Sequence, residues 1–231
     1  MERFVKRYFL KNVCTLCIVS VLLIVAAAGC VKLERASLDR TYYTLDVVRQ
    51  GQKSISSVTD TNLIVRRMKV SSRYEDKDLV YQVSGNVYEA DYYNAFFVPP
   101  ASMLTQELKV WMSESGLFVN VLGPESLGTG EFMLEGVVNS LYGDFSGESP
   151  KAVIKMQFFV FNNADPNMPI IYSRNFSEEV PVKDQTASAL VEAMNTGISL
   201  IFAELEKDVA KVAKDMSKVA KDVSKGPKEQ K

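Results

Sequence analysis

The hydrophobic pattern begins with an apolar segment that follows a basic stretch. Four cations, Arg3, Lys6, Arg7 and Lys11, precede an apolar or weakly polar run over residues 13–28. This order is typical of a secretory signal peptide. An uncleaved membrane anchor needs about 20 apolar residues, and this run has 16. The pattern therefore favours an exported protein over a membrane-spanning one.

The next part of the chain is rich in strand-forming residues. Alternating and β-branched runs predict strands at residues 42–48, 63–70, 79–83 and 87–90. Ser84-Gly85-Asn86 separates the last two, which is typical of a hairpin turn.

A helix and a meander of strands are predicted next. Pro99-Pro100 and Gly116 enclose an apolar helical stripe, which predicts a helix over about residues 100–115. Further strand patterns follow at residues 117–122, 132–142, 151–161 and 170–176. The last three predict an antiparallel meander with one covered face. Within it, Ile170, Tyr172 and Phe176 are expected on one side.

A long helix, expected to be capped by Asp184, ends the chain in a heptad pattern. Its first half is expected to pack on the sheet, whereas residues 207–231 extend too far and need another partner. The alternative is a frayed, charged tail. The stripe that would bind a partner is Phe202, Leu205, Val209, Val212, Met216, Val219 and Val223.

Charge is divided unevenly between these segments. Residues 30–206 have a net charge of −8, and residues 207–231 have a net charge of +4. An acidic body argues against nucleic-acid binding. The basic tail either contacts anionic headgroups or an acidic partner, or forms a solvated helix face.

Composition also restricts the chemistry of the protein. The chain has no histidine, which removes His-dependent catalysis and most zinc sites. We find no catalytic residues, no metal ligands and no phosphate-binding loop, so we predict a protein without enzymatic activity. A hydrolase with an unrecognised carboxylate pair is the alternative.

The apolar segment ends in Ala27-Ala28-Gly29-Cys30, which resembles the lipobox of bacterial lipoproteins, although Ala27 stands where Leu is more common. The resemblance implies removal of residues 1–29 and attachment of diacylglycerol and an N-acyl chain, palmitate being typical, to Cys30. Cys14 and Cys17 lie in the removed segment, so no thiol remains for a disulfide. Val31, in place of Asp, favours the outer membrane of a Gram-negative bacterium over the inner one, facing the periplasm.

After a tether at residues 30–40, Tyr42-Tyr43-Thr44-Leu45 begins a pattern that resembles the ABC-type transport auxiliary lipoproteins, the PqiC-like group. The similarity continues in order over residues 41–206. It includes Leu63-Ile64-Val65, Leu79-Val80-Tyr81 and Asn94 to Pro100, where Phe or Tyr replaces the family's usual Trp.

The resemblance implies an α/β fold in which two helices pack on a mixed, largely antiparallel sheet, like the TolB N-terminal domain. It implies a non-catalytic partner of MCE-domain proteins and ABC transporters that move lipids or other hydrophobic molecules across the envelope. Some family members form rings. It implies no cofactor beyond the acyl chains on Cys30.

The candidate partner or lipid surface consists of Tyr92, Tyr93, Phe96 and Phe97, because aromatic residues are enriched in the cores of interfaces. The alternative is that these side chains form part of the core under the first helix. A different function, that of a structural lipoprotein assembling through its heptad tail, also remains open.

Overall fold

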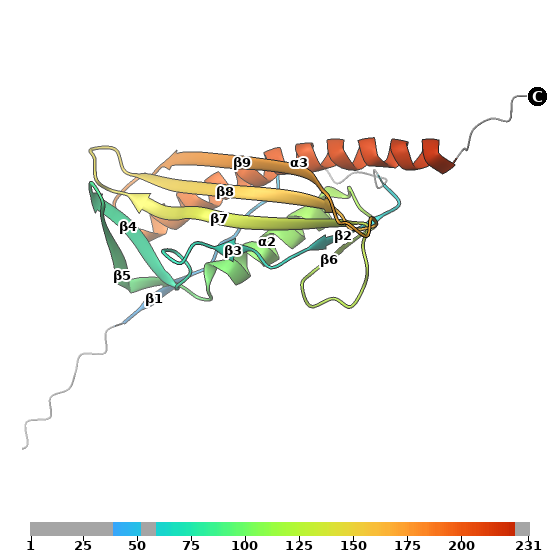
Figure 1. Ribbon diagram of the computed structural model, residues 1–231. Coiled ribbons are helices and arrows are strands. Elements are labelled where there is room, and N and C mark those ends of the chain that lie inside the picture. The colour runs from blue at the N-terminus through green and yellow to red at the C-terminus, as the bar shows by residue number, and fades with distance from the viewer. Residues whose placement is uncertain (1–38, 52–58, 225–231) are drawn as a thin grey trace, which may run out of the picture. The chain divides into compact units, whose positions relative to one another are not determined.

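Two helices cover one face of a nine-stranded sheet in the part of the chain that the structure describes (Figure 1). The structure is a computed structural model and describes residues 39–51 and 59–224. Residues from Arg40 onward form one compact unit, and the fold below is the fold of that unit. The signal peptide, Cys30 and Val31 lie outside the described residues.

One side of the sheet is an antiparallel meander of three long strands, as predicted. These are β7 (Phe132–Asp144), β8 (Lys151–Asn162) and β9 (Ile170–Pro181). In β8, Ile154, Met156 and Phe158 alternate with more exposed residues and face the core, because successive side chains of a strand point to opposite faces.

Three shorter strands lie one after another along the other edge of β7, all parallel to it. They are β2 (Asn62–Val65), β3 (Lys69–Val70) and β4 (Asp78–Ser84). The strand predicted at residues 63–70 is therefore divided in two. Between the two parts, the backbone N–H of Met68 donates to Oγ1 of Thr105 at 2.9 Å instead of to a strand.

The sheet is completed by β5 (Val87–Phe96), which is antiparallel to β4, and by β1 (Thr41–Tyr43), which is parallel to β5. At its other end, β6 (Asn120–Leu122) pairs with β2. The hairpin between β4 and β5 is confirmed. The strand predicted at residues 42–48 ends at Tyr43, because the N–H of Val47 donates to Glu107 at 3.1 Å instead of to a strand.

The first helix, α2 (Pro100–Ser115), has the predicted bounds, and Gly116 follows it with the left-handed φ of 68°. The second, α3 (Ala187–Ser224), is continuous over 38 residues, so residue 207 lies inside it. Asp184 does not cap α3. Thr186 does, because its Oγ1 accepts the N–H of Ala189 at 3.2 Å, and Asp184 instead accepts the N–H of Thr186.

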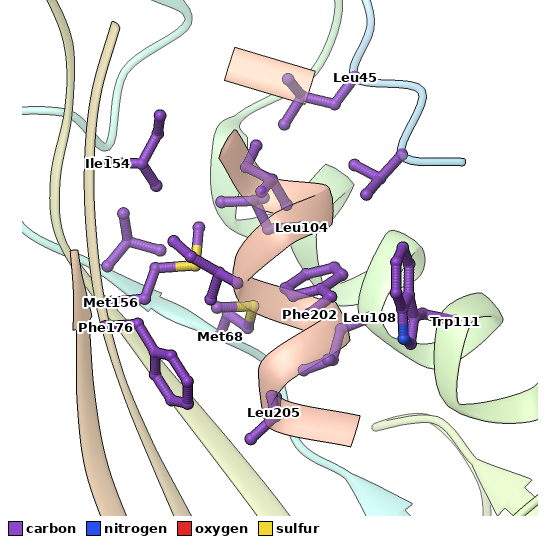
Figure 2. Packing of buried hydrophobic residues seen from close by; sticks show 14 of the residues in the cluster. Leu45, Met68, Leu104, Leu108, Trp111, Ile154, Met156, Phe176, Phe202 and Leu205 are labelled. Carbon is purple, nitrogen blue, oxygen red and sulfur yellow. The ribbon is translucent and has the colours of Figure 1, made fainter. Parts of the chain in front are cut away.

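One hydrophobic core lies between the helices and the sheet (Figure 2). Phe202 of α3 is at its centre, with its ring 5.7 Å from that of Trp111 and 6.3 Å from that of Phe158. Both contacts are edge-on, a favoured geometry for aromatic pairs. The predicted fold class, a mixed, largely antiparallel sheet with two packed helices, is confirmed.

Candidate functional site

Three of the four predicted aromatic residues are exposed and the fourth is not. Tyr92, Tyr93 and Phe97 have 58%, 53% and 62% of their surface exposed, whereas Phe96 has 3%. Phe96 lies in the core, as the alternative interpretation held. Tyr42 of β1 is also exposed and lies beside Phe97, with ring centroids 6.2 Å apart. We call Tyr42, Tyr92, Tyr93 and Phe97 the aromatic surface.

The aromatic surface depends on a bulge in β5. Asp78 of β4 pairs with Ala95, but the next residue, Leu79, pairs with Asp91. The intervening residues of β5 therefore have no partner in β4, and Tyr92 and Tyr93 are among them. A bulge of this kind redirects side chains that a regular strand would alternate between its faces.

The carboxylate of Asp91 holds the bulge in place. Its Oδ1 accepts the N–H groups of Tyr93 and Asn94 at 2.8 and 3.0 Å, and its Oδ2 accepts Nδ2 of Asn94 at 2.9 Å and the hydroxyl of Tyr81 at 3.2 Å. Burial tends to raise the pKa of Asp91, but these hydrogen bonds outweigh it and lower the pKa. Burial likewise raises the pKa of Tyr81, which therefore stays a hydrogen-bond donor.

A cation joins the rings of the aromatic surface. The guanidinium carbon of Arg40 lies 5.2 Å from the ring centroid of Tyr92 and 6.0 Å from that of Tyr42. Arg40 is also paired with Asp78. Stacking of guanidinium on an aromatic face is favourable and orients both groups. The result is an exposed apolar surface with fixed ring orientations at the start of the folded unit.

Sequence reasoning did not assign Arg40 and Tyr42 to this site. The sequence places Tyr42 in a predicted strand and in the family pattern. Its place beside Phe97 follows from the pairing of β1 with β5, in which Tyr42 is opposite Ala95. Parallel pairing between residues 53 positions apart in the chain, as Tyr42 and Ala95 are, has no local signature in the sequence.

The second predicted site, the stripe along α3, is divided between core and surface. Phe202, Leu205 and Val209 are buried in the core. These side chains therefore pack within the domain and do not face a partner. Val212 and Met216 are partly buried. The side chains of Val219 and Val223 lie outside the described residues. Binding of a partner by the outer part of the stripe stays a prediction.

The described residues contain no group of three or more His, Cys, Asp or Glu side chains placed to hold a metal ion. None of the helices in residues 39–51 and 59–224 is both long and apolar enough to cross a membrane.

Comparison with known proteins identifies a family. The model of the family described as "ABC-type transport auxiliary lipoprotein component" matches residues 43–206. No curated protein matches the chain.

Two solved structures show the same fold at low sequence identity. Protein XCC0632 from Xanthomonas campestris, of the DUF330 family, has a TM-score of 0.68 and 16% identity, and the match covers 77% of this chain and 99% of that one. A structure described as an uncharacterized protein has a TM-score of 0.59 and 18% identity, with 74% and 99% covered.

Proposed function

We propose, because the chain belongs to the family of ABC-type transport auxiliary lipoprotein components, that it is a non-catalytic subunit of a transport system in the bacterial envelope. The signal peptide at residues 1–29 is removed, and Cys30 receives diacylglycerol and an N-acyl chain. Each buried CH₂ group contributes about 0.8 kcal/mol, so several chains anchor the protein stably. Val31 directs it to the outer membrane, facing the periplasm.

The partner in this proposal is an MCE-domain protein that works with an ABC transporter and moves lipids or other hydrophobic molecules. The observation that carries the proposal is the aromatic surface. Monomeric proteins rarely leave clustered aromatic side chains in water without a function, and Tyr, Phe and Arg are enriched at the centres of protein interfaces. Arg40 and the Asp91 bulge fix the rings before binding, which reduces the entropy cost of association.

The proposal is tested by photo-crosslinking in cells of the organism that makes the protein. A photoreactive amino acid is placed at Tyr93 of the full-length lipoprotein, and captured proteins are identified by mass spectrometry. We expect an MCE-domain protein. The matched control carries the same group at Leu127, which is fully exposed in the loop before β7. Equal capture from both positions, or capture of proteins unrelated to transport, would contradict the proposal.

A second candidate function is assembly of the envelope protein through α3. The specific observation in its favour is that α3 continues to Ser224, while Met216 is the last residue packed against the core among those of α3 whose side chains the structure describes. In this case the crosslinks concentrate in residues 218–224 and join copies of the chain. A ring built through the aromatic surface would instead give self-crosslinks from position 93.

A further inference from the structure

A second surface feature lies on the face of the sheet opposite the helices. It is a cavity of about 610 Å³ at the junction between β2 and β3. It is lined by Ile64, Arg66, Arg67, Met68, Lys69, Pro124, Met133, Glu135, Gly136 and Val137. Its volume lies within the range of about 300–1,000 Å³ that is usual for small-molecule sites.

Strand register places the floor of this cavity on the face without helices. Ile64 pairs with Met133, and Lys69 pairs with Val137, and paired residues share a face. Ile64, Met133 and Val137 are not part of the main core, whereas the alternating residues Leu134 and Val138 are. Met133 is nevertheless almost fully buried, and its Sδ accepts a hydrogen bond from Nη1 of Arg66 at 3.5 Å.

The cavity carries positive charge on an acidic body. Arg66 and Lys69 contribute two cations against the carboxylate of Glu135, while residues 30–206 have a net charge of −8. The guanidinium of Arg67 points elsewhere, because its Nη2 donates to Oγ of Ser102 in α2 at 3.5 Å. Nη1 of Arg66 lies 3.4 Å from Oε1 of Glu135, and its side chain remains 54% exposed. Within residues 39–51 and 59–224, the ammonium group of Lys69 makes no hydrogen bond or ion pair. Donors for an anion are therefore present.

An apolar row leads away from the cavity across the same face. The pairing places Ile64 beside Met133, Met133 beside Phe161, and Phe161 beside Ile170. The sequence predicted Ile170 on the same side as Tyr172 and Phe176, and this was wrong. A shift in register after Val160 turns Ile170 to the other face, where it is exposed.

We propose that this cavity binds a lipid with a phosphate headgroup. The phosphate is held by Arg66 and Lys69, since a guanidinium and an ammonium group form strong charge-assisted hydrogen bonds with phosphate. The first carbons of the acyl chain lie along Phe161 and Ile170, which removes apolar surface from water. A free phosphate ester shares the headgroup chemistry but gains nothing from the apolar row. The inference does not depend on the partner proposed above.

The test uses the full-length lipoprotein in phosphatidylcholine nanodiscs, with ¹³C-labelled methionine methyl groups observed by NMR. The probe is dihexanoyl phosphatidate, which is water-soluble. We expect a saturable shift of the Met133 methyl signal, identified with a Met133→Leu variant. Glycerol 3-phosphate tests the headgroup alone, and dihexanoyl phosphatidylcholine tests the chains with a zwitterionic headgroup. Both should bind at least about tenfold more weakly than the phosphatidate.

Variants separate the two parts of the site. Arg66→Gln and Lys69→Gln should each weaken phosphatidate binding about tenfold. Lys183→Gln, a matched change at an exposed cation paired with Glu192, should leave it unchanged. Ile170→Ser should reduce the advantage of phosphatidate over glycerol 3-phosphate without altering the affinity for the latter.

Several outcomes would overturn the inference. The absence of a Met133 shift would show that the cavity takes no such ligand, and equal binding of glycerol 3-phosphate would reduce it to a plain anion site. Equal weakening by Lys183→Gln would indicate nonspecific attraction to surface charge. If Ile170→Ser dissociated an oligomer in light scattering while phosphatidate caused no shift, the row would be an interface between copies of the chain.

Discussion

Arg49 and Glu206 form a two-pronged ion pair that ties the segment after β1 to α3. Nε of Arg49 donates to Oε2 of Glu206 at 2.8 Å, and its Nη2 donates to Oε1 at 2.7 Å. The indole N–H of Trp111 donates to the same Oε2 at 2.8 Å. Hydrogen bonding to Glu206 raises the pKa of Arg49. One carboxylate thus joins the N-terminal segment, α2 and α3.

This pair should contribute strongly to stability, because only 8% of the Arg49 side chain and 19% of the Glu206 side chain are exposed. We expect Glu206→Gln to lower the free energy of unfolding by about 3 kcal/mol, since it leaves a buried cation without its counter-charge. Urea denaturation of the full-length protein measures this. The matched control is Glu192→Gln, which removes an exposed pair with Lys183 and should cost less than about 1 kcal/mol. Equal losses from both variants would contradict the structural role of Glu206.

The aromatic surface and the core respond differently to truncation of their side chains. Tyr93→Ala and Phe97→Ala should change the free energy of unfolding by less than about 1 kcal/mol, because both side chains are largely in water. The neighbouring change Phe96→Ala, which empties a core position, should cost about 3–5 kcal/mol. Denaturation gives the stabilities, and photo-crosslinking gives partner capture. If Tyr93→Ala or Phe97→Ala unfolded the protein, these rings would serve packing and not recognition.

The bulge that Asp91 holds in place should make the free energy of unfolding depend on pH in the acidic range. The pKa of Asp91 in the folded protein is below its reference value of 3.8, so the unfolded chain binds a proton more readily. The stabilisation is therefore present above the unfolded pKa and is lost as the pH falls through the folded pKa.

We expect Asp91→Asn to be less stable at neutral pH and to lose less stability than the wild type between about pH 5 and about pH 2. Asn94→Ala is the matched variant, because it keeps the carboxylate of Asp91 and removes the side chain that donates to it. The slope of its free energy of unfolding against pH should lie between those of the wild type and Asp91→Asn. Denaturation at a series of pH values measures the slopes. Identical slopes for Asp91→Asn and the wild type would exclude this role of Asp91.

Elements with a complete local signal were predicted correctly from the sequence. The helix α2 has a proline pair at its start and a glycine in the left-handed conformation at its end, and both are fixed by short-range sterics. The alternation in β8 revealed its buried face for a similar reason. Where the local pattern and a contact distant in the sequence favoured different structures, the structure follows the distant contact. The strand predicted at residues 63–70 is interrupted because the backbone N–H of Met68 donates to Thr105 of α2.

The candidate sites were harder to predict because their geometry depends on long-range pairing. An alternating pattern cannot distinguish Phe96 from Phe97 once a bulge follows Asp91. The basic cavity combines residues of β2, β3 and β7 that no motif connects. Along α3, a heptad spacing indicates an apolar face but not whether a sheet or a second helix covers it, and Phe202, Leu205 and Val209 face the core.

The end of α3 should divide into a part that belongs to the domain and a part that does not. Val209 and Ala213 are almost fully buried, and Oδ2 of Asp208 accepts hydrogen bonds from Tyr172 and Arg174 of β9 at 2.7 and 2.8 Å. Ending the chain after Glu206 would remove all of these contacts.

We therefore expect truncation after Glu206 to lower the free energy of unfolding by about 4 kcal/mol or more, from lost burial of apolar surface and the lost ion pair. Truncation after Ser217 keeps those contacts and should change it by less than about 1 kcal/mol. Truncation after Ser217, which removes fewer residues, is thus the proper test of assembly. Denaturation and light scattering are measured on both variants. An oligomer that survives the cut after Ser217 excludes residues 218–231 as the assembling element, whereas loss of the oligomer with unchanged stability assigns assembly to them. Equal stability losses from the two cuts would contradict the division of α3 at this point.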